Sequence, residues 1–179
     1  MTLKIALLVA MVMVFTPASE ADSRFKMCGG SVVKVDTNSI QGIPNPIKIS
    51  VGEVLNVKAT AEISRDLPLT LTTRVKIERD MGWLGLGWWT LPCSQFGPNG
   101  CKLPVITCAS LQRDFQWPPS CPIKAGTYKF DRAIKIPKID LGGLGSMIGS
   151  GTYRMKVELL QGGQVIGCGE GNAKVELNL

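Results

Sequence analysis

Apolar and polar residues alternate with a period of two along several stretches of this chain. In residues 69–78, Leu69, Leu71, Val75 and Ile77 share one face, and Thr, Arg, Lys and Glu residues occupy the other. The same alternation marks residues 55–63, 153–159 and 173–177, with shorter candidates at 31–37, 46–51 and 128–136. This period is typical of antiparallel strands with one face buried and one in water. The sequence therefore predicts an all-β fold, an antiparallel sandwich or flattened barrel of about eight strands.

The alternation also predicts which side chains point into the interior. The residues predicted to line the interior are Leu71, Val75, Ile77, Ile134, Met155, Val157 and Leu159. No segment has a convincing helical period, and residues 104–115 are expected to hold at most one short turn of helix. No internal repeat or low-complexity linker divides the chain, so residues 22–179 are predicted to form a single domain.

The first residues read as a signal peptide. Lys4 precedes an unbroken apolar run of 11 residues from Ile5 to Phe15. As a helix this run would span about 16 Å, which is short of a bilayer core of roughly 30 Å. Small residues follow, and they favour cleavage after Ala21, with Ala18 as the alternative. The sequence therefore predicts export of the mature chain.

Two glycine-rich segments break the alternation, Gly82–Leu91 and Leu141–Gly151. Their apolar residues are Trp83, Leu84, Leu86, Trp88 and Trp89 in the first segment, and Leu141, Leu144, Met147 and Ile148 in the second. The simplest interpretation is that the tryptophans pack into the core or cover one end of it. However, the adjacent Trp88 and Trp89 would point to opposite sides of an extended backbone. Exposed apolar loops usually mark a ligand or membrane contact, so we expect these segments to touch lipid.

Cysteine content and charge narrow the class of protein further. Six cysteines in an exported chain indicate three disulfides, although spacing alone leaves their pairing open. A zinc site is the alternative, but the chain has no histidine and no CxxC pair. The net charge of +6 favours attraction to anionic surfaces such as acidic lipids. Lysine and arginine form no dense run, so nucleic acid is not expected as a partner.

The sequence offers little chemistry for catalysis. Without histidine, the common nucleophile–histidine arrangements are impossible. Ser146 does not lie in a G-x-S-x-G motif. Glu78 and Asp80 could act as paired carboxylates, but a solvated strand edge beside Arg79 is the simpler interpretation. We therefore expect neither enzymatic activity, nor a cofactor, nor a metal.

Four short motifs, in this order, resemble those of the ganglioside activators. They are WWTLPC at 88–93, SCPIKAGTY at 120–128, GTYR at 151–154 and IGC at 166–168. The ganglioside activators belong to the ML lipid-recognition superfamily. The resemblance implies a β-cup whose two splayed sheets enclose an apolar cavity for acyl chains, lined by the inward residues named above.

The resemblance also implies the disulfide pairing and the role of one loop. The matching cysteine pattern pairs Cys28 with Cys168, Cys93 with Cys101, and Cys108 with Cys121. Trp88 matches a tryptophan of the family's membrane-touching loop, and Met147 stands where the family has a second tryptophan. The family's fourth disulfide and its N-glycosylation site are absent.

The function implied is that of a carrier. The chain is expected to extract a ganglioside-like glycosphingolipid or related lipid from an anionic membrane and to present it to a lysosomal hydrolase such as β-hexosaminidase. Its expected location is lysosomal or secreted. The alternatives are a secreted lipid- or sterol-recognition or defence protein of the same superfamily, and a binding module with a filled core that transfers no lipid.

Overall fold

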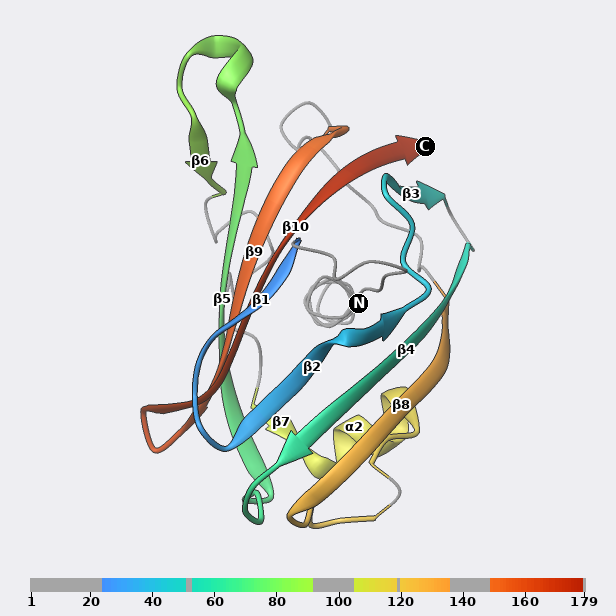
Figure 1. Ribbon diagram of the computed structural model, residues 1–179, viewed down its shortest axis with the longest axis vertical. Coiled ribbons are helices and arrows are strands. Elements are labelled where there is room, and N and C mark those ends of the chain that lie inside the picture. The colour runs from blue at the N-terminus through green and yellow to red at the C-terminus, as the bar shows by residue number, and fades with distance from the viewer. Residues whose placement is uncertain (1–23, 51–52, 92–104, 119, 136–148, 179) are drawn as a thin grey trace.

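Two β-sheets face each other in the computed structural model, which describes residues 24–50, 53–91, 105–118, 120–135 and 149–178 (Figure 1). The smaller sheet has the order β2 (Val33–Gln41), β4 (Val54–Ile63) and β8 (Gly126–Lys135). The larger sheet has the order β1 (Phe25–Gly29), β10 (Gln164–Asn178), β9 (Gly151–Gln161), β5 (Thr70–Asp80) and β6 (Trp88–Thr90). Two short strands extend it: β3 (Ile47–Ser50) pairs with β10, and β7 (Ile106–Thr107) pairs with β5. The fold is thus all-β, as predicted, and is an open pair of sheets rather than a closed barrel.

Two short helical elements accompany the sheets. The 3₁₀ helix η1 (Gly82–Leu84) lies between β5 and β6, and α2 (Cys108–Phe115) follows β7. Thr107 begins α2 with reciprocal hydrogen bonds: the Ser110 amide donates to Thr107 Oγ1 and the Thr107 amide donates to Ser110 Oγ, each at 3.0 Å. These bonds satisfy amides that the first helical turn leaves unpaired. The helical turn expected in residues 104–115 is therefore confirmed.

The alternation of apolar and polar residues correctly predicts which side chains of the central strands are buried. In β4, the inward residues Leu55, Val57, Ala59 and Ile63 are 5%, 0%, 4% and 2% exposed, whereas the alternate residues Val54, Asn56, Lys58 and Glu62 face solvent. One predicted inward residue is wrong, since Leu69 is 62% exposed. Leu69 precedes the first residue of β5, so the pleat that directs Leu71 inward does not include it.

The described residues form ten strands rather than about eight, because three short strands, β1, β6 and β7, were not predicted. The first half of β10 also escaped the pattern. Glycines at 167, 169 and 171 remove the inward side chains that would reveal alternation in β10. β6 lies within residues 82–91, where we expected no strand. β3 pairs with β10 in parallel, which is the exception to the predicted antiparallel arrangement.

The buried apolar residues form two clusters between the sheets. The hairpin-side cluster contains Ile43, Ile47, Leu55, Val57, Val75, Ile77, Leu91, Ile134, Tyr153, Met155, Ala173 and Val175. The helix-side cluster contains Val32, Ile63, Leu67, Leu71, Ile106, Cys108, Leu111, Ile123 and Ile166. Each cluster draws residues from both sheets, so burial of these faces holds the sheets together.

The chain crosses between the sheets along one edge, at residues 30–33. The Val32 amide donates to the Ile166 carbonyl of β10 at 3.0 Å, and the Ser64 amide, just after β4, donates to the Val32 carbonyl at 2.9 Å. Glycine permits this approach, because a Cβ at Gly167 would lie 3.0 Å from the Val33 Cβ. Val32 therefore joins the smaller sheet to the larger one through backbone contact.

Two of the three implied disulfides are confirmed. Cys28 is bonded to Cys168 beside this crossing, and Cys108 is bonded to Cys121, which ties α2 to the segment before β8. The Cys93–Cys101 pair lies outside the described residues, as does the predicted signal peptide. The first disulfide joins positions 140 residues apart, a separation over which a cross-link strongly restricts the unfolded chain.

Gly42 offers a test of the packing between the β2–β3 connection and β4. Its φ is +95°, and a Cβ there would overlap the Asn56 carbonyl oxygen. Gly163, in the β9–β10 turn, has a similar φ of +83° but nothing within 4 Å of such a Cβ. We expect Gly163→Ala to lower the free energy of unfolding by about 1 kcal/mol and Gly42→Ala by about 3 kcal/mol or more. Denaturant titration measures both, and equal losses would contradict the close approach.

Candidate functional site

The β5–β6 hairpin projects from one end of the larger sheet (Figure 1). Its turn is closed by a hydrogen bond from the Met81 amide to the Gly87 carbonyl at 2.7 Å. The Gly82 amide also donates to Asp80 Oδ1 at 2.8 Å. Gly85 and Gly87 have φ values of +72° and +62°, which favour glycine. The glycines of this segment thus shape a tight turn with its own hydrogen bonds.

Apolar side chains at this turn are exposed. Leu84, Leu86 and Trp88 are 48%, 68% and 36% exposed, whereas Trp89 packs against the hairpin-side cluster. The two adjacent tryptophans therefore do point to opposite sides, as their sequence predicts. We call Leu84, Leu86 and Trp88 the hairpin tip. Trp89 belongs to the interior rather than to this tip, and the side chain of Trp83 is not among those described.

The chain that leads out of the second glycine-rich segment reaches the same end of the sheet. Tyr153 donates its hydroxyl to the Gly149 carbonyl at 2.6 Å, and Arg79 Nη2 donates to the Ser150 carbonyl at 3.1 Å. The Arg79 guanidinium also lies 5.9 Å from the centre of the Tyr153 ring. The predicted rim residues Leu141, Leu144, Met147 and Ile148 lie outside the described residues, so their contribution stays a prediction.

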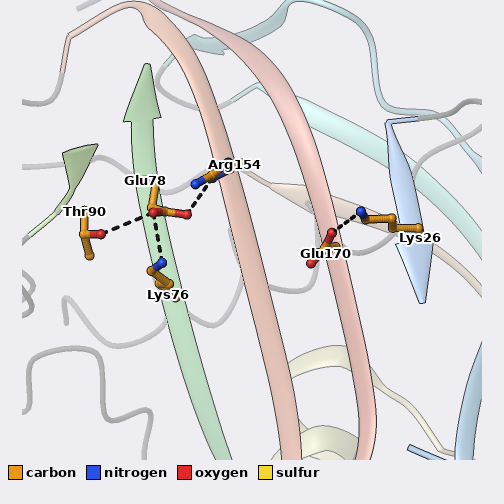
Figure 2. Close-up of polar contacts among 6 residues, drawn as sticks. All are labelled: Lys26, Lys76, Glu78, Thr90, Arg154 and Glu170. Carbon is orange, nitrogen blue, oxygen red and sulfur yellow. Dashed lines mark hydrogen bonds and ion pairs between the residues drawn. The ribbon is translucent and has the colours of Figure 1, made fainter. Parts of the chain in front are cut away.

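A charged cluster on the outer face of the larger sheet supports the hairpin (Figure 2). Glu78 accepts a hydrogen bond from Arg154 Nε at 2.6 Å, pairs with Lys76 Nζ at 2.9 Å and accepts from Thr90 Oγ1 of β6 at 3.3 Å. The Arg154 guanidinium also lies 4.5 Å from the centre of the Trp88 ring, close enough for a cation–π contact. Glu78 and Arg154 therefore connect β5, β9, β6 and the hairpin tip.

Glu78 differs from the solvated carboxylate that its outward position predicts. It is only 8% exposed. The hydrogen bond from Arg154 lowers the pKa of Glu78 from 4.5 to about 2, with a further contribution from Lys76 and against the effect of burial. Asp80 accepts a hydrogen bond from the turn amide of Gly82. This geometry serves to hold the hairpin.

The residues predicted to line the interior do face it. Val75, Ile77, Ile134 and Met155 belong to the hairpin-side cluster, and Leu71 belongs to the helix-side cluster. Val157 and Leu159 pack against these clusters but are only partly buried. An apolar interior is therefore present between the sheets, and its occupation by a ligand stays a prediction.

The described residues offer neither a metal site nor a membrane-spanning helix. There, no group of three or more histidine, cysteine, aspartate or glutamate side chains could hold a metal ion. No helix in the described ranges is long and apolar enough to cross a membrane. The features that remain are the exposed hairpin tip and the apolar interior beside it.

Comparison with known proteins assigns the class. The family model of the ML domain matches residues 22–175, and the chain belongs to the ML domain family. The ganglioside GM2 activator of Mus musculus is 27% identical to it over 137 residues, which are 70% of this chain and 67% of the mouse protein. The resemblance drawn from the four sequence motifs is thus confirmed.

Solved structures resemble the chain more distantly. A Niemann-Pick type C2 protein from the Japanese carpenter ant matches with a TM-score of 0.46 and 15% identity, covering 85% of this chain and 98% of that chain. The C-terminal domain of wzt matches with a TM-score of 0.37 and 9% identity, covering 89% and 82% respectively.

Sequence reasoning missed Arg154 and Arg79 as parts of the site. Arg154 lies at an outward position of β9, where a basic residue is ordinarily solvated. Arg79 shares the inward side of β5 with Val75 and Ile77 but lies next to the end of the strand, where the alternation is no guide to burial. The signal that could have found Arg154 is its placement within the GTYR motif. Its contact with Trp88 depends on the pairing of β5 with both β6 and β9, which a local pattern does not reveal.

We expect Glu78→Gln to lower the free energy of unfolding by about 1 to 2 kcal/mol at pH 7, since it removes a charge held by two partly exposed cations. The folded pKa is depressed, so the stabilisation is complete above the ordinary value of 4.5 and is lost as pH falls through about 2. Denaturant titrations at several pH values should show the gap to the wild type closing below pH 4.5.

Glu62→Gln, on the exposed face of β4, is the matched control and should change stability by less than about 0.5 kcal/mol. A gap for Glu78→Gln that stays constant down to pH 2 would contradict the role assigned to this carboxylate.

Proposed function

We propose that this chain is a non-enzymatic lipid-binding and transfer protein that takes lipid from an anionic membrane at the hairpin end of the molecule. Membership of the ML domain family supports the class. The observation that carries the proposal is the position of three exposed apolar side chains, Leu84, Leu86 and Trp88, beside the apolar interior. In a chain with a net charge of +6, such a tip is suited to an acidic bilayer surface.

The structure supports a route from the tip to the interior. Trp88 is exposed, but its neighbour Trp89 packs against the hairpin-side cluster, so the same strand contacts both environments. Inward residues such as Phe130 and Val157 pack against this cluster and remain only partly buried. These partly buried apolar side chains would contact an alkyl chain that entered between the sheets.

The energetic need for such a carrier is large. Ten acyl methylenes exposed to water cost roughly 8 kcal/mol, so a lipid leaves a bilayer slowly on its own. A protein that offers an apolar interior at the membrane surface lowers this cost, because the chain exchanges one apolar environment for another.

A ganglioside-like glycosphingolipid is the lipid that we propose, with a lysosomal hydrolase such as β-hexosaminidase as the partner that receives it. The likeness to a ganglioside GM2 activator supports this assignment. A lysosomal or secreted location accords with the predicted signal peptide, which ends where the family match begins. The alternative is a secreted lipid- or sterol-recognition protein of the same family.

The first test concerns the hairpin tip. Leu84→Ser combined with Leu86→Ser should slow extraction of a fluorescent ganglioside from phosphatidylserine-containing vesicles about tenfold or more, because two apolar contacts with the bilayer are lost. Trp88 and Trp89 are poorer targets, since Arg154 contacts one and the core surrounds the other. Extraction rates are measured by loss of self-quenching in the vesicles.

Leu69→Ser is the matched control, because Leu69 is 62% exposed and lies at the opposite end of β5. It should leave the extraction rate unchanged. Equal slowing by the control and the tip variants would refute the assignment of the membrane-facing end.

The second test identifies the ligand. Protein secreted from eukaryotic cells should carry glycosphingolipid at near one molecule per chain, measured by mass spectrometry of an organic extract. A recovered sterol or phospholipid would favour the alternative function. A folded protein that stayed empty, and took up no lipid from vesicles, would contradict the proposal.

A further inference from the structure

A buried hydroxyl without a hydrogen-bond partner lies on the inner face of β5. Thr73 is 4% exposed, and its Oγ1 has no partner among the described residues. It points inward with its neighbours Leu71 and Val75, which are also buried. Burying an unpaired hydroxyl costs about 1 to 3 kcal/mol, so valine would be the natural residue here if the interior were only a core.

A second buried donor without a partner lies against the smaller sheet. Trp117 follows α2, and its ring packs edge-on against Tyr128 and Phe130 of β8, with centroid distances of 5.7 and 6.4 Å. Its indole Nε1 is buried and likewise has no partner within the described part of the chain. Tryptophan usually finds a partner for this group when it is buried.

Both groups adjoin the boundary between the two apolar clusters. Thr73 lies between Leu71 of the helix-side cluster and Val75 of the hairpin-side cluster. Trp117 packs against the helix-side cluster and also against Phe130, which packs against the hairpin-side cluster. On the facing β4, Ala59 and Ala61 occupy the corresponding stretch between the two clusters. The boundary therefore combines small side chains with two polar atoms that lack partners.

We propose that this boundary binds a neutral oxygen of the lipid, a hydroxyl or a carbonyl, through Thr73 Oγ1 and Trp117 Nε1. The inference rests on the proposed lipid-binding function and narrows its substrate class. Because indole N–H can only donate, the ligand group must accept a hydrogen bond. A charged group would have to be desolvated among apolar side chains, which is far more costly, so the ligand atom is neutral. The site thus selects lipids whose alkyl part carries a neutral oxygen.

The test compares two probes that differ by one oxygen, 1-hexadecanol and hexadecane, delivered from cyclodextrin to the delipidated full chain. Titration calorimetry should show that the wild type binds the alcohol about tenfold more tightly than the alkane. Thr73→Val should remove most of this preference and Thr73→Ser should retain it. Trp117→Phe, which keeps an aromatic ring but removes the N–H, should reduce the preference as well.

Stability of the empty protein provides an independent readout. Thr73→Val should leave the melting temperature unchanged or raise it, because it removes an unsatisfied hydroxyl and keeps the shape of the side chain. If the wild type and Thr73→Val bind the two probes with the same ratio, the proposed site is wrong although the lipid-binding function stands. A uniform loss of affinity for both probes would show a merely structural role and also overturn it. If the folded wild type binds neither probe, the proposed function fails with it.

Discussion

The backbone contact between residues 30–33 and β10 sets the geometry of the whole interior. Val32 is hydrogen-bonded to both sheets, and the absence of a side chain at Gly167 lets Val33 approach β10 closely. Backbone hydrogen bonds hold the two sheets together along this edge. Elsewhere, the size of the inward side chains sets the distance between the sheets. At the opposite edge, α2 and Trp117 lie between the two sheets, next to β7 and β8. The inner faces of the two sheets are therefore covered only in part. Inward side chains such as Phe130, Val157 and Leu159 remain partly exposed.

The hairpin is held to this arrangement by charge as well as by the apolar contacts of Trp89 and Leu91. β6 is only three residues long and, among the strands that the structure describes, pairs only with β5, so few backbone hydrogen bonds hold it. Glu78 compensates, because its two oxygens engage Arg154, Lys76 and Thr90 from three strands. Arg154 also covers one face of Trp88. An exposed apolar tip can thus be held in place without being buried, a combination that a membrane-contacting element requires.

Sequence patterns predicted those parts of the fold in which every inward position carries a side chain. The alternation in β4, β5 and β9 placed Val57, Ile77 and Met155 in the interior. It failed in β10, where glycines occupy inward positions, and at Leu69, which lies just beyond a strand end. Neither the pairing of β3 with β10 nor the Cys28–Cys168 bond has a local signal, since both join distant segments. The cysteine pairing was available only through the family resemblance.

The candidate site was predictable to a similar extent. The apolar tip was visible as leucines and tryptophan among glycines, whereas the burial of Glu78 depends on neighbours contributed by other strands. Thr73 did carry a signal in the sequence, as a hydroxyl at an inward position between Leu71 and Val75. Whether such a residue finds a partner is decided by the facing layer, so the pattern could not show that it lacks one.

The low pKa of Glu78 determines how its charge responds when the surrounding pH changes. Its carboxylate stays charged at the pH of the cell exterior and at that of a degradative organelle, and the chain contains no histidine that would titrate between them. The charge of Glu78, and with it the ion pair to Arg154 that supports the hairpin, would therefore be the same at both ends of an export or uptake route. A response of lipid release to acidification would then not originate in the titration of Glu78.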